Sequence, residues 1–526
     1  MKNLSLLVFA TSALLCACSN DNAGSGTPDG GGDGGRGTGG AQTDASSGAG
    51  GKTTSNTGGS GGNTGTTSTG GSGGGMNTGG ALTDGGAGDA RVADAGPDGS
   101  NPRARTFTVT LENVGAVKLF TSGGVFNTPA GDANPGPATP GKKYEFSIDA
   151  GRKQKLSFAT MLAATNDLFY GPDGDGIALY DDHGDPISGD VTSQIHLWDA
   201  GTEINEEPHE GPNTVTRQSA PNTGPDEHGN VVDIADATDG VKFDYPAVNA
   251  VIKVTVTHMT GTQFKVSIED VSTATALHTS GGDFPAPLSP GVWVVHNGTD
   301  PLYTVGKPDR MQGLEHLAED GNPTMLGAFI ADNVGITYPA SPGVWVLHKT
   351  GTKPLFTEDK PDYGDGIEGI AEDGNPTNLA GNLTKLDGEI DGAVFNTPVG
   401  SSSAGPILPG SKYQFTFEAS PGDALSFATM LAATNDVFFG PGDTGITLFD
   451  SAGNPLNGDV TDQIRLWDAG TEGNEEPGIG PNTVTNQLAP NTGTPGEGKV
   501  QLLSDVGDGF SYPTVNAVLK VTIAAQ

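Results

Sequence analysis

The chain has 526 residues, with 63 Asp or Glu against 26 Lys or Arg, so its formal net charge at pH 7 is -37. A surface of this charge repels nucleic acids and other phosphate-rich partners, and it favours divalent cations. The only 2 cysteines are Cys16 and Cys18, which excludes an internal disulfide framework in a mature exported chain.

The amino terminus predicts export and lipid attachment. Residues 1–17 carry a basic Lys2 and an apolar stretch too short to span a membrane, which is typical of a signal peptide. Residues 15–18, Leu-Cys-Ala-Cys, resemble a bacterial lipobox and make Cys18 the expected lipid-bearing residue. The alternative is an ordinary cleaved signal. Ser19 is not the Asp that retains many lipoproteins at the inner membrane, so we expect the outer membrane or cell surface, with the lipid as the only membrane contact.

Residues 18–105 form the next segment. They are mostly Gly, Ser, Thr, Asn and Asp, with almost no aliphatic side chains. Such a composition cannot bury enough apolar surface to offset the chain entropy that folding costs. We therefore expect a disordered tether whose root-mean-square span is roughly 50 Å.

One module occurs twice after the tether. The run LSFATMLAATND stands at 156–167 and 425–436, and LWDAGTExNEEPxxGPN stands at 197–213 and 466–482. Both runs are displaced by the same 269 positions (436 minus 167). Between them, short apolar runs alternate with Gly, Pro, Asp and Asn, which predicts an all-β fold of antiparallel sandwiches.

Repeated edges give the module boundaries. Phe107, Val109 and Leu111 alternate with polar residues, and the same pattern recurs in residues 263–268, as in a half-buried strand. We therefore place the first module at 106–259 and the second at 263–526, the second being longer because of an insertion at about 277–385.

The insertion is itself a tandem. SPGVWVVH at 289–296 and SPGVWVLH at 341–348 are each followed by an apolar-periodic stretch and by EDGNP. Leu314, Leu317 and Ala318 have helical spacing, residues 321–323 break the helix, and apolar periodicity then resumes. We expect two short helical hairpins, both docked on the second sandwich.

The repeated motifs resemble the spondin amino-terminal domain of the F-spondin and mindin type. The resemblance rests on an Asn-Asp pair before an aromatic strand, on WDAGT followed by an acid, and on a later Pro-Asn pair. It covers most of the chain after about residue 106. It implies C2-like antiparallel β-sandwiches, one bound calcium ion per module, and adhesion or partner binding. The chain departs from the eukaryotic members in having no disulfide, and its helical segment is absent from the first module and doubled in the second.

The acids of these motifs are the candidate metal ligands. Calcium takes six to eight oxygen ligands and tolerates irregular loops, so two acids four positions apart beside a glycine are suitable. The resemblance implies one ligand set in each module: Asp167, Asp199 and Glu203 in the first, and Asp436, Asp468 and Glu472 in the second. The family usually has Asp where Glu203 and Glu472 stand. The alternative is that these acids only cap turns. Transition metals are disfavoured because the cluster contains no Cys and no repeated His.

Other repeated residues have two interpretations. Glu206, Glu207, Glu475 and Glu476 can form a rim for a partner or second ion, or belong to a solvated loop. The pairs Trp293 with His296 and Trp345 with His348 can stack on a sugar, or can be a core ring beside a satisfied imidazole.

We expect a lipid-anchored, calcium-binding adhesion or ligand-binding protein of the cell surface, and not an enzyme. Its partner would be an extracellular glycan, protein or envelope component, and not a nucleic acid. A metal-dependent extracellular hydrolase, with an acid such as Glu206 activating water, is the first alternative. The chain has no HExxH motif to support it. A structural component of the envelope coat is the second.

Overall fold

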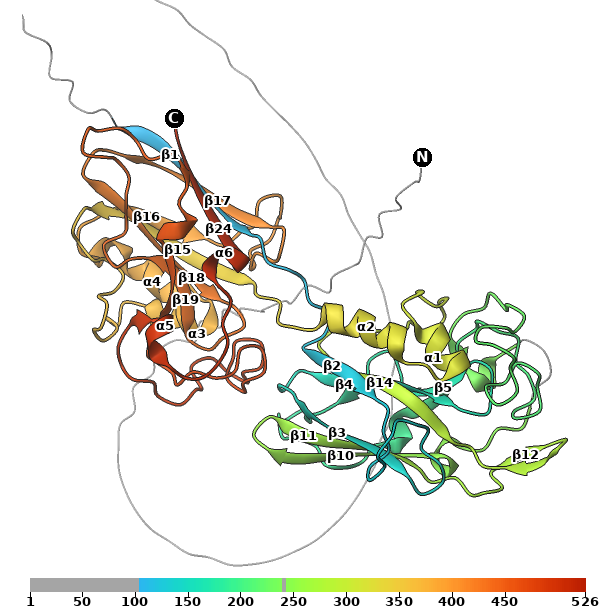
Figure 1. Ribbon diagram of the computed structural model, residues 1–526. Helices are drawn as coiled ribbons and strands as arrows, with labels where there is room; N and C mark the ends of the chain where they lie inside the picture. The colour runs from blue at the N-terminus through green and yellow to red at the C-terminus, as the bar shows by residue number, and fades with distance from the viewer. Residues whose placement is uncertain (1–103, 239–242) are drawn as a thin grey trace, which may run out of the picture. The chain divides into compact units, whose positions relative to one another are not determined.

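The computed structural model describes residues 104–238 and 243–526 (Figure 1). The predicted signal peptide, the predicted lipidation site Cys18 and residues 18–103 of the predicted tether lie outside the described residues. Within the described residues, no helix is long and apolar enough to cross a membrane.

The described chain is mostly β-strand in antiparallel sheets, which confirms the predicted fold class. The strands form two β-sandwiches. We call residues 120–334 sandwich I, and residues 105–113 together with 340–526 sandwich II. Each has a larger and a smaller sheet, and a pair of short helices that packs against the larger sheet.

In sandwich I the larger sheet has the strand order β2-β14-β4-β5-β8-β9, with β6 paired to β4, and the smaller has the order β3-β11-β10-β7. The strands of the larger sheet are β2 (Ser122–Phe126), β14 (Leu288–His296), β4 (Lys155–Leu162), β5 (Leu168–Pro172), β8 (Ile195–Asp199), β9 (Val232–Asp233) and β6 (Ile177–Ala178). Those of the smaller sheet are β3 (Lys143–Asp149), β11 (Gln263–Asp270), β10 (Ile252–Thr260) and β7 (Gly189–Asp190). The remaining elements are the hairpin β12 (Leu277–Thr279) and β13 (Gly282–Phe284), the helices α1 (Leu314–Asp320) and α2 (Thr324–Asn333), and the 3-10 turns η1 (Thr192–Gln194), η2 (Ile234–Asp236) and η3 (Val248–Ala250).

Sandwich II repeats this plan, with the orders β16-β15-β18-β19-β22-β23 and β17-β1-β24-β21, and with β20 paired to β18. The strands of its larger sheet are β16 (Glu389–Phe395), β15 (Ala340–Lys349), β18 (Asp423–Leu431), β19 (Val437–Pro441), β22 (Ile464–Asp468), β23 (Gln501–Leu502) and β20 (Ile446–Thr447). Those of its smaller sheet are β17 (Lys412–Ala419), β1 (Arg105–Asn113), β24 (Leu519–Ala525) and β21 (Gly458–Asp459). Its helices are α3 (Ile367–Asp373), α4 (Thr377–Asn382), α5 (Leu503–Val506) and α6 (Val515–Val518), with the 3-10 turns η4 (Leu383–Lys385) and η5 (Thr461–Gln463).

The larger sheet of each sandwich is buried on both faces. One face packs against the smaller sheet, and the other is covered by the helix pair, α1 with α2 in sandwich I and α3 with α4 in sandwich II. This explains why nearly every residue of β4 and β18 is buried instead of every second one, because a strand covered on both sides buries both of its faces.

Strand pairing does not follow the predicted module boundaries of 106–259 and 263–526. The strand at the start of the first predicted module, β1, lies between β17 and β24 of sandwich II. Conversely, β14 from the start of the predicted insertion lies between β2 and β4 of sandwich I. Figure 1 shows this mixing as a blue strand among the orange and red strands of sandwich II. Sandwich I is therefore inserted between the first strand of sandwich II and the rest of it.

The helical hairpins are confirmed as elements, but their predicted docking is wrong. The break at residues 321–323 separates α1 from α2, and Gly321 ends α1 with a positive φ of 64°. The first pair covers sandwich I and only the second covers sandwich II. The first sandwich therefore has its own helical cover, supplied from a later part of the chain.

A local hairpin explains why β11 belongs to sandwich I and β1 to sandwich II. β10 and β11 are joined by a turn at Gly261, whose φ is 56°, and they pair from Thr260↔Gln263 onward. Closing so short a loop costs little entropy, so β11 fills the place beside β10 in sandwich I. The equivalent place in sandwich II then remains for β1, which has the same apolar pattern.

Candidate metal centre

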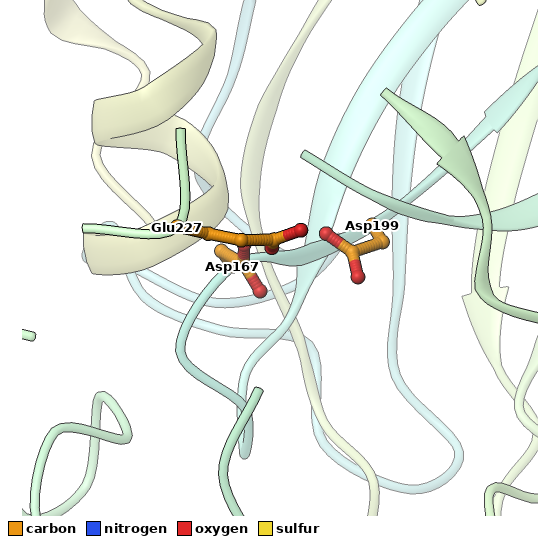
Figure 2. A group of neighbouring side chains, drawn as sticks. All are labelled: Asp167, Asp199 and Glu227. Carbon is orange, nitrogen blue, oxygen red and sulfur yellow. The ribbon is translucent and has the colours of Figure 1, made fainter. Parts of the chain in front are cut away.

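Three acids of sandwich I meet at one end of the larger sheet. Asp167 directly precedes β5, and Asp199 ends β8; the two strands pair at Leu168↔Asp199, so the two acids are neighbours. Glu227 comes from the long loop between β8 and β9. One carboxylate oxygen from each lies within 4.8 Å of the others. Figure 2 shows the carboxylates of Asp199 and Glu227 pointing toward each other beside Asp167.

Asp167 is the buried centre of this group. Its side chain is 0% exposed, and its Oδ1 has no hydrogen-bond partner. Its Oδ2 accepts two long hydrogen bonds, of 3.2 Å each, from the backbone amides of Thr202 and Glu203. Burial first, and then the neighbouring charges of Asp199 and Glu227, raise the pKa of Asp167 well above its usual value. A buried acceptor without a donor is costly, so this oxygen fits a bound cation.

The loop after β8 holds Asp199 in place. Its Oδ1 accepts a 2.7 Å hydrogen bond from the Gly201 amide, and its Oδ2 accepts one of 2.5 Å from Asn205 Nδ2. Gly201 has a φ of 68°, and a Cβ there would lie 2.6 Å from the Asn230 carbonyl oxygen. Only glycine permits this turn, as the WDAGT motif predicts.

The structure does not bring Glu203, the predicted third ligand, into the group. Its Oε1 accepts a 2.7 Å hydrogen bond from the Gly224 amide, and its Oε2 accepts one of 3.3 Å from Asn166 Nδ2. The carboxylate therefore fastens the 204–229 loop. The third acid within 4.8 Å is Glu227, outside the motif.

Sandwich II repeats the pair Asp436 and Asp468 at equivalent positions. Asp436 Oδ1 is again buried without a hydrogen-bond partner, and burial together with the charge of Asp468 raises the pKa of Asp436 well above its usual value. The carboxylate of Glu472, like that of Glu203, is held by a loop amide and not by the aspartate pair. Its Oε1 accepts a 2.6 Å hydrogen bond from the Gly493 amide.

The third acid differs between the two sandwiches. Counting 269 positions on from Glu227 gives Gly496, which has no carboxylate. Asp508 lies near Asp468 instead. Asn474 Nδ2 donates to both carboxylates, to Asp468 Oδ2 at 2.7 Å and to Asp508 Oδ2 at 3.0 Å. Burial raises the pKa of Asp468 to about 6, and the charges of Asp508 and Glu497 add to this.

Sequence reasoning missed a buried acid on each helix pair. Glu319 at the end of α1 and Glu372 at the end of α3 are both buried, and each has an Oε2 without a hydrogen-bond partner. Burial raises the pKa of Glu319 to about 8 and that of Glu372 to about 7. The repeated EDGNP run is the signal that could have pointed to them, because it places the same acid twice.

The rim glutamates have structural partners. Glu206 accepts hydrogen bonds from both the amide and the side chain of Asn213, at 2.8 and 2.6 Å, and Glu475 does the same with Asn482. Glu207 accepts two hydrogen bonds from Ser280. Each of these glutamates fastens a loop. Glu476 is exposed.

The two Trp–His pairs fit the structural interpretation. Trp293 stacks on Phe146 and Trp345 on Phe415, with ring centroids 5.2 and 5.4 Å apart. The imidazoles are buried: His296 Nε2 lies 2.9 Å from Ser157 Oγ, and His348 Nε2 lies 3.0 Å from Ser426 Oγ. These rings belong to the sandwich interiors.

Comparison with known proteins identifies no family for this chain. The chain matches no protein-family model, and a search of the curated proteins finds no relative.

Proposed function

We propose that the chain is an exported calcium-binding protein that acts in adhesion or ligand binding at the cell surface. The observation that carries the calcium proposal is the buried, unpartnered Oδ1 of Asp167, which recurs at Asp436. Around each oxygen stand further carboxylates, which are hard ligands on flexible loops and therefore suit calcium. In sandwich I the proposed ligands are Asp167, Asp199 and Glu227. In sandwich II they are Asp436 and Asp468, with Asp508 beside them.

The adhesion part of the proposal rests on the predicted export and tether and on the resemblance to spondin domains. The site lies where long loops leave the larger sheet, so an ion there would order the surface that those loops form. The hydrolase alternative is weakened because Glu206, its proposed base, accepts two hydrogen bonds from Asn213. The expected partner is an extracellular glycan, protein or envelope component.

Thermal unfolding of the full chain tests the cation proposal. Calcium should raise the melting temperature of chelator-treated protein more than magnesium does, because only the folded state gathers the carboxylates. The double variant Asp199→Asn with Asp468→Asn should lose that response without being less stable than wild type in chelator, because it removes repulsion between acids. Asp182→Asn, at an exposed turn residue, is the matched control and should respond as wild type does.

Two results would oppose the proposal. One is an identical melting curve with calcium and with chelator, combined with no calcium in the purified protein. The other is a calcium response that survives in the double variant. Calcium-dependent binding of the chain to glycans or envelope fragments would then test adhesion separately.

A further inference from the structure

Sandwich II is completed by a strand that comes from the far end of the chain. β1 pairs with β17 from Arg105↔Ala419 onward, and with β24 on its other side along nearly its whole length. In Figure 1 it is the blue strand beside β17 and β24. Without residues 105–113, the smaller sheet would have a gap between two strands that both need a partner.

The gap recognises a particular kind of strand. Main-chain pairing on both sides selects an extended segment of about nine residues, and the sandwich interior selects its alternate side chains. Phe107, Val109 and Leu111 are fully buried there. Phe107 packs against two rings, those of Phe417 and Phe449, with centroids 5.9 and 5.4 Å away.

No tight hairpin joins β1 to either of the strands it pairs with, so the chain connection does not hold it in the gap of its own chain. The equivalent strand of sandwich I, β11, follows β10 through a tight hairpin and cannot leave without it. β1 instead continues through residues 114–121 into sandwich I. In this connecting segment Val117 and Leu119 are 60% and 49% exposed, and Phe120 near its end packs into the core of sandwich I.

We propose that the gap between β17 and β24 also accepts β1 of a second copy of this chain, so that copies become linked by exchanged strands. Every copy carries both the strand and the gap, and the contacts are the same whichever copy supplies the strand. The balance between the two arrangements therefore depends on the connecting segment and on the local concentration of chains. Copies concentrated on one surface would favour exchange. The proposal is independent of the cation site.

Disulfide trapping tests this in the full chain, with Cys16 and Cys18 replaced by Ser. Thr108 on β1 pairs with Thr416 on β17, and their hydroxyl oxygens are 3.3 Å apart on the exposed face. One tagged chain carries Thr108→Cys, and a differently tagged chain carries Thr416→Cys. After concentrated incubation and mild oxidation, we expect a disulfide between the two tags, in an amount that rises with protein concentration.

Sandwich I supplies the matched control. Lys265 on β11 pairs with Ser147 on β3, which are the equivalent positions. Chains carrying Lys265→Cys and Ser147→Cys should give several-fold less of the mixed disulfide, because the hairpin holds β11 in its own chain. A single chain with Thr108→Cys and Thr416→Cys should close internally, which shows that the geometry permits the bond. If that chain closes but the mixture gives no more product than the control, β1 fills only its own gap and the proposal is wrong.

Discussion

Sandwich I and sandwich II share one fold but differ where charge is buried and where a strand comes from. At the end of the equivalent strands, sandwich I has a buried Asp270 and sandwich II a buried Asn113. Before the shared Pro-Leu pair, sandwich I has Asp300, whereas Lys353 of sandwich II forms a 2.6 Å ion pair with Asp443. The comparison shows that the strand pattern and the paired aspartates of the candidate metal centre are common to both. The residues around them have diverged.

The largest difference to test is the origin of the completing strand. Val109→Asp places a carboxylate in the core of sandwich II, and Val266→Asp does the same in sandwich I. Each should cost its own sandwich more than about 4 kcal/mol of unfolding free energy. Segment-resolved hydrogen exchange should show lost protection in residues 340–526 for Val109→Asp, and in residues 120–334 for Val266→Asp. Lost protection of residues 122–259 in the Val109 variant would instead support the sequence-predicted modules.

The next difference is the buried acid at the end of β11. Burial raises the pKa of Asp270 to about 6, and one carboxylate oxygen has no hydrogen-bond partner. Because this pKa is higher in the folded state, the contribution of Asp270 to stability is full below about pH 4 and is lost as the pH rises to about 6. Asp270→Asn, which copies Asn113, should stabilise the protein at pH 7 by about 1–3 kcal/mol.

Denaturant unfolding at pH 4 and pH 7 measures this effect. The difference between the variant and wild type should shrink at the lower pH, where the wild-type carboxyl is protonated. A variant that is less stable than wild type at pH 7 would mean that Asp270 makes a favourable ionic contact.

The third difference lies in the acids of the two candidate metal centres. Glu227 supplies a carboxylate in sandwich I, whereas Gly496 occupies the equivalent position in sandwich II. Glu227→Gln should weaken calcium binding at the first centre by about tenfold, or roughly 1.4 kcal/mol, and leave the second unchanged. Calorimetric titration of the variant and of Asp508→Asn should separate the two centres. Equal weakening of both by Glu227→Gln would contradict the assignment.

The smallest expected effect concerns the ion pair that only sandwich II has. Lys353 is partly exposed beside Asp443. Exposed pairs contribute about 0.2–1 kcal/mol, so Lys353→Ala should lower the unfolding free energy by no more than that. The loss should diminish at high salt, because the pair is screened. A larger, salt-independent loss would show that the lysine stem packs against the sandwich.

The sequence alone determined the repeated module, the all-β class and the two helical hairpins, which follow from strand alternation, glycine turns, helical spacing and motifs repeated at a constant displacement. The break between α1 and α2 at residues 321–323 is one such local feature that the structure confirms. The aspartate pairs at 167 with 199 and 436 with 468 were implied by the resemblance to the spondin domain.

Tertiary structure alone decided which strand and which helix pair belong to which sandwich. β1 and β11 have the same apolar alternation, so only the entropy advantage of the β10–β11 hairpin separates them. It also decided the third acid of the first centre. Glu203 and Glu227 are both loop carboxylates, and only the folded loop shows that Glu203 is held by the Gly224 amide while Glu227 faces Asp199. The direction of a side chain within a long loop depends on contacts between residues far apart in the sequence. A local sequence pattern does not predict such contacts.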